Sequence, residues 1–341
     1  MKKILIILTL LTGLIACKNQ NVEFPDFKYT AGYFPYQYPV RTLILGHDYS
    51  DNTNDNNHKF LISVAFGGVY NNKENRIFTI DVLPSLCNNV LFNTTHDTIR
   101  LMPPSYYTLS SNQITIPVGK ENAGVEVQLT EAFFNDPLAL KLAYVIPVRI
   151  VSATGVDSIL VGKVNEGLTN PDRRQTTDWS VQPKDFTMFA VNYINPFHGN
   201  YLHRGTNVVK DASAKILETN VYHTYYIERN EIWSLVNTTK NQVTVTGSTH
   251  SVLGPTSLSM NLTFADDSTC TITQITGSPY TITGNGRFIS NADSWGNKPR
   301  DAIFISYTIT SGTNTVSAID TLTARDRGVA MQLYAPIIYA K

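Results

Sequence analysis

Short runs in which apolar and polar residues alternate follow one another along most of the chain. In the segment Tyr144–Ile150, even-numbered and odd-numbered side chains fall on opposite faces of an extended strand. The segment Ser257–Phe264 alternates in the same way. These runs are rich in Val, Ile, Thr and Phe, which is typical of strands, and no segment keeps helical spacing for more than two turns. The pattern therefore predicts an all-β protein.

Residues 39–164 hold the first group of predicted strands. They recur every ~8–12 residues with turn residues between them, a spacing typical of a β-sandwich. An immunoglobulin-like sandwich is the favoured form, although the Cys…Trp…Cys hallmark of that fold is absent. The expected strands are Arg41–Leu45, Phe60–Phe66, Ile77–Val82, Thr98–Leu101, Gln113–Val118, Val125–Leu129, Tyr144–Val151 and Ser158–Val161.

The next segment, 165–184, is polar and contains Pro171 and Pro183, so we expect it to be an inter-domain connector. Residues 185–341 then form a second β-rich region with hairpin-sized turns. A meander of many strands needs closure to avoid open edges, which favours an up-and-down β-barrel. The expected strands are Phe186–Tyr193, Lys215–Glu218, Ile232–Val236, Gln242–Thr246, Ser257–Phe264, Cys270–Ile275, Tyr280–Ile282, Gly286–Ile289, Ala302–Thr310, Thr315–Leu322 and Ala330–Tyr334.

The N-terminus has the pattern of an export signal. Two lysines precede the apolar run Ile4–Leu11, which is shorter than the ~20 residues that a membrane-spanning helix needs. The stretch Leu14–Cys17 resembles the bacterial lipobox, in which cleavage exposes a cysteine that receives several acyl chains and so anchors the protein firmly. We expect a signal peptide over 1–16, a lipidated Cys17, and a tether over 17–38.

Composition narrows the range of partners. Of 341 residues, 27 are basic and 27 acidic, so no net field attracts nucleic acid and that class of partner is excluded.

Cys87 and Cys270 fall in different expected domains, and two buried free thiols are favoured over a disulfide. Because no Cys-x-x-Cys or His-x-x-x-His spacing is present, the sequence predicts neither a metal site nor a cofactor.

Catalytic motifs are missing from the sequence. There is no Gly-x-Ser-x-Gly, no His-Glu-x-x-His, and no cluster of acids of the kind a barrel glycosidase uses. His198 and His203 flank a short Gly-Asn-Tyr stretch, where a turn or strand end is favoured over a functional pair. Asp51–Asn57 lacks the glycine and glutamate of an EF-hand, which favours a solvated turn over a calcium site. We name no catalytic residue and expect a non-enzyme, with a glycosidase as the minor alternative.

Two places have the composition of a glycan site, where an aromatic face stacks on a sugar ring and polar side chains bind its hydroxyls. One is Trp295 with Asn297 and Arg300; the other is Trp179 with Asp178. For each tryptophan the competing interpretation is a plug at a barrel end or a domain interface. Trp233, set among apolar residues, is expected in the core.

Several stretches of the chain resemble a two-domain family of Bacteroidetes cell-surface lipoproteins. The first domain is similar to a domain of unknown function that also precedes the catalytic barrel of some endo-β-N-acetylglucosaminidases. The second resembles a calycin-like, lipocalin-shaped barrel. The stretches that carry the resemblance are Tyr38–Gly46, Gly67–Asn72, Tyr144–Ile150, Tyr193–Tyr201 and Trp295–Asp301. The resemblance implies a role beside glycan-uptake systems, with glycan bound at the cell surface.

Together these observations favour a non-catalytic, lipid-anchored surface protein that binds a glycan and assists a polysaccharide-uptake complex. Its expected partners are a glycan, the outer-membrane lipid through acylated Cys17, and a neighbouring uptake complex. We expect it on the outer membrane facing the exterior; the periplasmic face stays open because no acidic residue follows directly in Lys18–Asn21. The alternative function is a small-molecule or lipid carrier that uses the interior of the C-terminal barrel.

Overall fold

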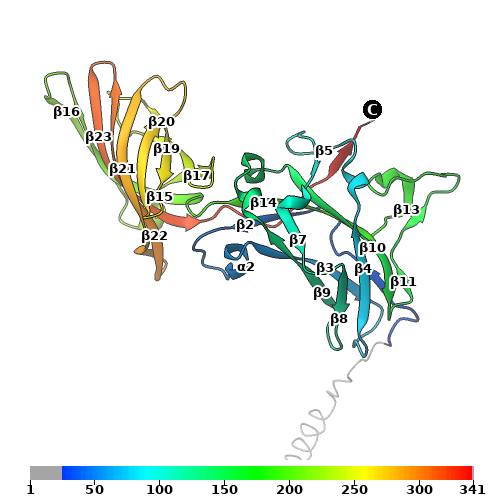
Figure 1. Cartoon of the computed structure of the whole chain (residues 1–341). Helices are drawn as coiled ribbons and strands as arrows, with labels where there is room; N and C mark the ends of the chain where they lie inside the picture. The colour runs from blue at the N-terminus through cyan, green and yellow to red at the C-terminus, as the bar shows by residue number, and fades with distance from the viewer. Residues whose placement is uncertain (1–24, 340–341) are drawn as a thin grey trace, which may run out of the picture.

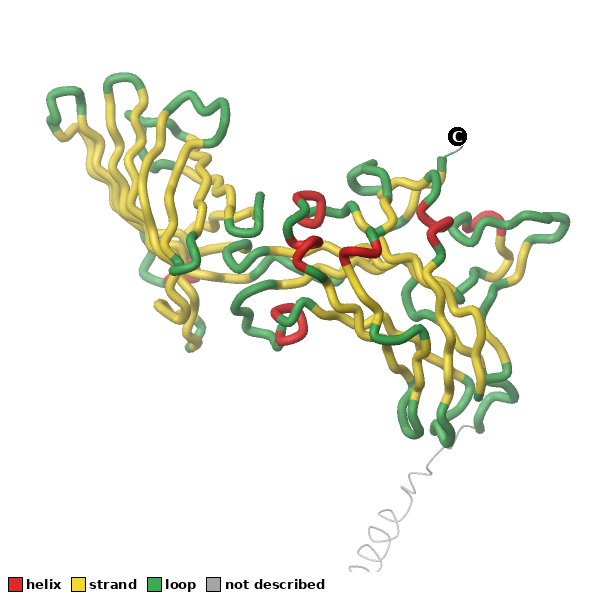
Figure 2. Tube along the Cα trace, viewed as in Figure 1, coloured by secondary structure: helices red, strands yellow, loops and turns green. Residues whose placement is uncertain are grey.

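The computed structural model describes residues 25–339, and the expected signal peptide 1–16 and Cys17 lie outside this range. Strands make up 53% of the structure and helices 8%, which confirms the all-β prediction. Figure 1 shows the two parts side by side, a sandwich-like first domain and a barrel, and Figure 2 shows how little helix connects their strands. None of the helices among the described residues has the length and apolar character needed to span a bilayer.

The first domain consists of two sheets packed around one core. One sheet has the order β11(Ser158–Ile159), β1(Ala31–Tyr33), β3(Lys59–Gly67), β9(Asn122–Leu129), β7(Tyr107–Leu109). The other has the order β24(Gln332–Leu333), β2(Pro39–Ile44), β14(Phe186–Ile194), β10(Tyr144–Thr154), β4(Arg76–Val82), β8(Gln113–Ile116), with β6(Arg100–Leu101) on β10. The alternating faces predicted from the sequence meet between the sheets, where Phe60, Ile62, Phe78 and Ile146 are buried. This arrangement confirms the predicted sandwich.

The domain boundary differs from the expected connector at 165–184. Strand β14 lies inside the first domain, antiparallel to β10 and parallel to β2. Seven of its nine residues are buried, because a central strand is covered on both faces. The polar segment before it is an excursion of the first domain and carries the pair β12(Lys163–Val164) and β13(Trp179–Val181). The barrel therefore begins after Ile194 and not at residue 185.

The chain also returns to the first domain after the barrel. Strand β24 pairs with β2, and β25(Pro336–Ile338) pairs with β5(Val90–Phe92). Between them Tyr334 enters a small core beside Phe92 and Met188. The expected barrel domain 185–341 is thus too long at both ends, and its last residues stabilise the sandwich.

Eight strands close the barrel through pairing of its first and last members, as predicted from the meander. In order they are β15(Gly199–Lys210), β17(Glu231–Asn237), β18(Gln242–Ser248), β19(Ser257–Phe264), β20(Thr269–Gln274), β21(Thr281–Trp295), β22(Lys298–Ser311) and β23(Asn314–Asp326), while β16(Ile216–Tyr222) pairs with the second half of β15. The barrel interior is filled by its own side chains, including Trp233, Leu262 and Ile303. Trp233 is 1% exposed, which confirms its expected place in the core. This packing argues against a carrier that holds its ligand inside the barrel.

Only short helices occur between the described strands. They are α2(Thr53–Asn56), α3(Glu131–Phe134), and the 3-10 turns η1(Pro84–Cys87), η2(Pro104–Tyr106), η3(Pro137–Leu140), η4(Thr176–Asp178) and η5(Ile227–Arg229). Cys87 and Cys270 are free thiols, as the sequence favoured, and burial raises the pKa of each to about 12.

We predict that Tyr334→Ala destabilises the sandwich domain, although this residue lies beyond the barrel in sequence. Its hydroxyl donates to the Met188 carbonyl at 2.9 Å, and its ring packs edge-on against Tyr38 and Phe92. Losing a buried aromatic ring costs about 3–5 kcal/mol in the free energy of unfolding, measured by chemical denaturation. Tyr339→Ala, which removes a ring that is 40% exposed, is the matched control and should change little. Equal effects of the two substitutions would contradict the placement of the C-terminal segment.

Candidate functional site

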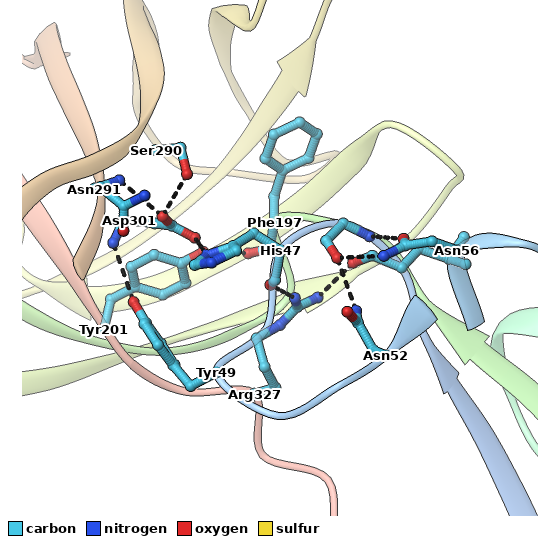
Figure 3. A network of polar contacts seen from close by, with 12 residues as sticks. His47, Tyr49, Asn52, Asn56, Phe197, Tyr201, Ser290, Asn291, Asp301 and Arg327 are labelled. Atoms are coloured by element: carbon cyan, nitrogen blue, oxygen red, sulfur yellow. Dashed lines mark hydrogen bonds and ion pairs between the residues drawn. The ribbon is translucent and has the colours of Figure 1, made fainter. Parts of the chain in front are cut away.

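Four segments meet where the two domains join, as Figure 3 shows. The loop after β2, around His47 and Tyr49, comes from the first domain. The link Asn195–His198 connects β14 directly to β15. The hairpin β21–β22 and the residues at the end of β23 come from the barrel. Every group in the network described next belongs to one of these segments.

The Arg327 guanidinium connects the two domains from a position just after β23. Its three nitrogens donate to four backbone carbonyls: His198 at 2.8 Å, Asn195 at 2.7 Å, His47 at 2.8 Å and Leu45 at 3.2 Å. Burial is the main cause of a lowered pKa for this group. Because each carbonyl accepts a bond from a charged donor, the loop and the link are held at a fixed distance from the barrel.

A second set of contacts connects the same loop to the β21–β22 hairpin. The Asp301 carboxylate, which is 5% exposed, accepts from His47 Nδ1 at 2.8 Å. It also accepts from Ser290 Oγ and the Asn291 backbone N–H, both at 2.9 Å. The Asp301 backbone N–H in turn donates to the Tyr49 hydroxyl at 3.2 Å. The buried charge is therefore well satisfied, and the hairpin is fixed against the first domain.

Arg300 lies between two aromatic rings, one from each domain. Its guanidinium carbon is 4.3 Å from the Tyr49 ring centre and 4.0 Å from the Trp295 ring centre. The Trp295 indole N–H donates to the Ala324 carbonyl at 3.0 Å, which fixes the ring against β23. This cation–π stack presents Tyr49, 40% exposed, at the surface of the junction.

A cleft of about 560 Å³ opens beside this stack, between the two domains. Its volume falls in the range of about 300–1,000 Å³ that is usual for ligand sites. Four arginines and four aspartates balance its charge, and Ser50 and Asn54 make no side-chain hydrogen bond to any described residue. The lining residues are Arg41, Ile44, Asp48, Tyr49, Ser50, Asp51, Asn52, Asn54, Asp55, Arg300, Arg325, Asp326, Arg327 and Val329. A polar, uncharged ligand suits such a surface better than a polyanion does.

The structure brings two of the sequence-predicted site residues together, Trp295 and Arg300, and only Arg300 lines the cleft. Asn297 is exposed in the turn at the tip of the hairpin. The second predicted place, Trp179 with Asp178, lies on the far side of the first domain (Figure 1). Trp179 is 7% exposed and donates to the Asp172 carbonyl at 2.7 Å, so little of its ring is open to a ligand.

The sequence did not indicate Tyr49, since a lone tyrosine in a loop carries no motif. The Asp/Asn-rich loop nearby was noticed and interpreted as a solvated turn. In the structure Asp55 is buried, pairs with Arg41, and accepts from the Ile44 backbone N–H at 2.8 Å. This loop therefore shapes one wall of the cleft, and one of its acids is structural.

A smaller hollow of about 310 Å³ lies on the first domain, near the polar excursion. Tyr36, Tyr38 and Tyr334 line it together with Arg173 and Gln182. Its lining is more apolar than that of the cleft, and it comes from the first domain alone. It is the second place where an aromatic-lined ligand site can form.

The described residues hold one group of three histidine, cysteine or acidic side chains with ligand atoms within 4.8 Å of one another. It consists of His203, Glu231 and His250 in the barrel, away from the cleft. The cleft residues themselves do not form such a group within the described range.

We predict that the free energy of unfolding falls as the pH is lowered from neutral to about 4, because of His198. Burial, with the charge of Arg327, lowers the pKa of His198 from 6.5 to about 4. The folded state therefore binds fewer protons than the unfolded state, so the stabilisation is complete above pH 6.5 and is lost as pH falls toward 4. The loss is up to about 3 kcal/mol. Urea unfolding across this range should show that the free energy of unfolding of His198→Gln depends less on pH than that of the parent protein. Parallel curves for the two proteins would show that His198 is not responsible for the pH dependence.

We predict that Arg327→Met separates the domains while leaving each one folded. Four carbonyls lose a charged donor, which costs about 3 kcal/mol. Small-angle X-ray scattering should give a larger radius of gyration, and thermal unfolding should split into two transitions. Arg325→Met is the matched control, because the Arg325 side chain is exposed and its nearest acid, Asp326, lies 3.7 Å away. A scattering profile unchanged by Arg327→Met would show that this residue does not hold the junction.

Two family models match different parts of the chain. Residues 196–328 match a domain of unknown function (DUF5627), and residues 26–157 match a model described as an N-terminal domain. The first of these matches begins at the junction that the structure shows and not at residue 185. A search of curated proteins gives no match.

Solved structures from Bacteroides resemble the chain to different degrees. A Bacteroides ovatus protein of unknown function is 36% identical, covers 92% of this chain and 100% of its own, and has a TM-score of 0.83. A multidomain protein including DUF1735 from the same organism is 14% identical (86% and 95% covered, TM-score 0.43), and an auxiliary nutrient binding protein from Bacteroides thetaiotaomicron is 12% identical (83% and 90%, TM-score 0.38). The last two scores are too low to support a conclusion. The first shows that the chain belongs to the same two-domain family as the Bacteroides ovatus protein of unknown function.

Proposed function

We propose that this protein is a non-catalytic, lipid-anchored surface protein that binds a glycan in the cleft between its two domains. The observation that carries the proposal is the cleft itself. It combines an exposed aromatic ring, Tyr49, with serine, asparagine, aspartate and arginine side chains on the surrounding wall. Aromatic faces stack on sugar rings and such side chains bind hydroxyl groups, so the lining suits an oligosaccharide.

The charge and rigidity of the cleft favour the same class of ligand. Its arginines and aspartates are equal in number, so a neutral ligand avoids the cost of burying an unpaired charge. The bonds made by Arg327 and Asp301 already fix both walls before any ligand binds. A preformed site loses less conformational entropy on binding, which benefits a flexible ligand such as a glycan.

The cellular part of the proposal rests on the sequence. Leu14–Cys17 supports lipid attachment at Cys17, which anchors the body to the outer membrane. Display on the cell exterior and assistance to a neighbouring polysaccharide-uptake complex follow from the resemblance to surface lipoproteins. Part of the expected tether over 17–38 is a strand of the first domain, because β1(Ala31–Tyr33) pairs with β3 and β11.

We predict that Tyr49→Ala weakens glycan binding by about 10-fold or more, as expected for the loss of one stacking ring. The test is a glycan array with residues 18–341, followed by calorimetry with each glycan that binds. Trp295→Ala should weaken binding less, because its ring supports Arg300 from behind the cleft wall. Tyr225→Ala is the control, since this ring is 92% exposed on the barrel and lies outside the cleft.

Three outcomes separate the alternatives. Binding that is lost in Tyr49→Ala and kept in Tyr225→Ala supports the cleft. Binding that survives Tyr49→Ala but is lost in Tyr36→Ala moves the site to the hollow on the first domain and overturns the location. If the parent protein binds nothing across host, plant and fungal glycans, the proposed function is wrong.

A further inference from the structure

Two histidines and a glutamate converge at a pocket in the barrel domain. His203 lies on β15, Glu231 begins β17, and His250 lies in the loop after β18. They line a pocket of about 270 Å³ together with Tyr222 and Asn230. His203 lies four residues beyond Gly199, the first residue of β15. None of the residues that line this pocket lines the cleft at the domain junction, so the two are distinct.

Their ligand atoms meet at one carboxylate oxygen. His203 Nδ1 lies 2.5 Å from Glu231 Oε1, and His250 Nε2 lies 2.6 Å from the same atom. Two ligands of a tetrahedral zinc ion are about 3.3 Å apart, given metal–ligand bonds of about 2.0–2.2 Å. Opening these contacts by less than about 1 Å therefore makes room for the ion. The Glu231 side chain is 36% exposed, and apart from the two histidines its carboxylate bonds only to the Trp233 indole N–H among the described residues, so its surroundings are compatible with a movement of this size.

The surroundings of His203 favour a cation at this point. Its side chain is fully buried, with an acid at each ring nitrogen: Glu231 at Nδ1, and Asp320 Oδ2 3.1 Å from Nε2. The Nε2 contact is too poorly aligned to count as a hydrogen bond, so this buried atom has no partner among the described residues. A neutral imidazole carries one proton and cannot donate to both acids. A metal ion on Nδ1 removes the conflict, because the proton then stays on Nε2 and faces Asp320.

That arrangement is the one in which proteins hold zinc-binding histidines. The second ring nitrogen of such a histidine usually donates to a carboxylate, which fixes the tautomer. Asp320 is itself held by the Tyr222 and Tyr307 hydroxyls, so it is positioned as a carboxylate. It occupies the outer position here, while Glu231 and the two histidines provide three direct ligands.

An aromatic ring stacks on each of the two imidazoles and positions it, and a hydrogen bond positions the Glu231 carboxylate. The Trp233 ring lies 3.6 Å from the His203 ring, and the Tyr222 ring lies 4.3 Å from that of His250. The Trp233 indole N–H donates to Glu231 Oε1 at 3.0 Å. Groups fixed in this way lose little freedom when an ion binds.

One unpartnered donor marks the open side of the pocket. The Asn230 side-chain oxygen accepts from the Thr224 backbone N–H and hydroxyl, at 2.6 and 2.9 Å. Its Nδ2 is buried and bonds to none of the described residues. This donor is available to an oxygen atom of a water or a ligand in the pocket.

We propose that His203, Glu231 and His250 bind one Zn²⁺ ion, with a fourth coordination position open to the pocket. Two imidazoles and one carboxylate are borderline donors that suit zinc, whereas Mg²⁺ and Ca²⁺ prefer sets made of oxygen atoms alone. Three protein ligands with an open position distinguish this site from a closed structural zinc site.

The test is calorimetric titration of Zn²⁺ into the full chain, purified in detergent and stripped with a chelator. Glu231→Gln and His250→Gln each remove one ligand at a partly exposed position, so folding is expected to survive; circular dichroism checks this. The control variant His96→Asn removes an exposed histidine of the first domain. The backbone φ angle at this position is 58°, which asparagine also tolerates. Mg²⁺ serves as the control ion.

We expect one Zn²⁺ per chain, a rise in the melting temperature of the barrel at saturating zinc, and no response to Mg²⁺. Each ligand variant should weaken zinc binding by about 100-fold, while His96→Asn should leave it unchanged. Absence of stoichiometric zinc binding, or binding that neither ligand variant weakens, would overturn the proposal and leave a hydrogen-bonded cluster around His203. Glycan binding in the cleft is measured separately, so either proposal can fail without the other.

Discussion

The half-buried guanidinium of Arg327 is the constraint on which the arrangement of the two domains depends. A charge removed from water must be satisfied by polar groups, and here backbone carbonyls from the first domain and from the short link do so. Because those carbonyls belong to different parts of the chain, satisfying the charge also fixes the parts relative to one another. The cleft wall formed by Tyr49 and Arg300 exists only when this geometry is kept.

The cleft lies outside both cores and the His203 group borders the core of the barrel, where His203 stacks on Trp233, so the fold alone says little about function. Both cores consist of side chains from their own domains, chiefly aliphatic and aromatic ones. The chemistry is instead found where strands end: the loop after β2, the tip of the β21–β22 hairpin, and the start of β17. This division is common, since a rigid scaffold holds functional groups on its loops and edges.

Alternation of apolar and polar residues predicted the strands and the fold class well, because side chains on a strand point to opposite faces by geometry alone. The boundary at 165–184 was wrong because the apolar strand Phe186–Ile194 has the same composition whether it begins a barrel or fills the centre of a sheet. Trp295 and Arg300 were recognised as a pair by proximity in sequence. Their partner Tyr49 comes from 251 positions earlier than Arg300, and no sequence spacing can indicate such a contact.

The same limit applies to the histidine and glutamate cluster. Glu231 is 28 residues from His203 and 19 from His250, so no short motif joins them, and the sequence around His203 was interpreted as a turn or strand end. Strand pairing brings the first two together, because His203 and Glu231 are opposite each other in the β15–β17 register. Register follows from the closure of the whole barrel, and this information is absent from any local stretch.

The claim that both domains contribute to one ligand site can be tested most directly by hydrogen–deuterium exchange with and without a glycan that binds. We expect residues 46–55 of the first domain and residues 293–301 and 325–329 beyond it to become protected together. Protection confined to one domain, or centred on Tyr36 and Tyr334, would contradict it.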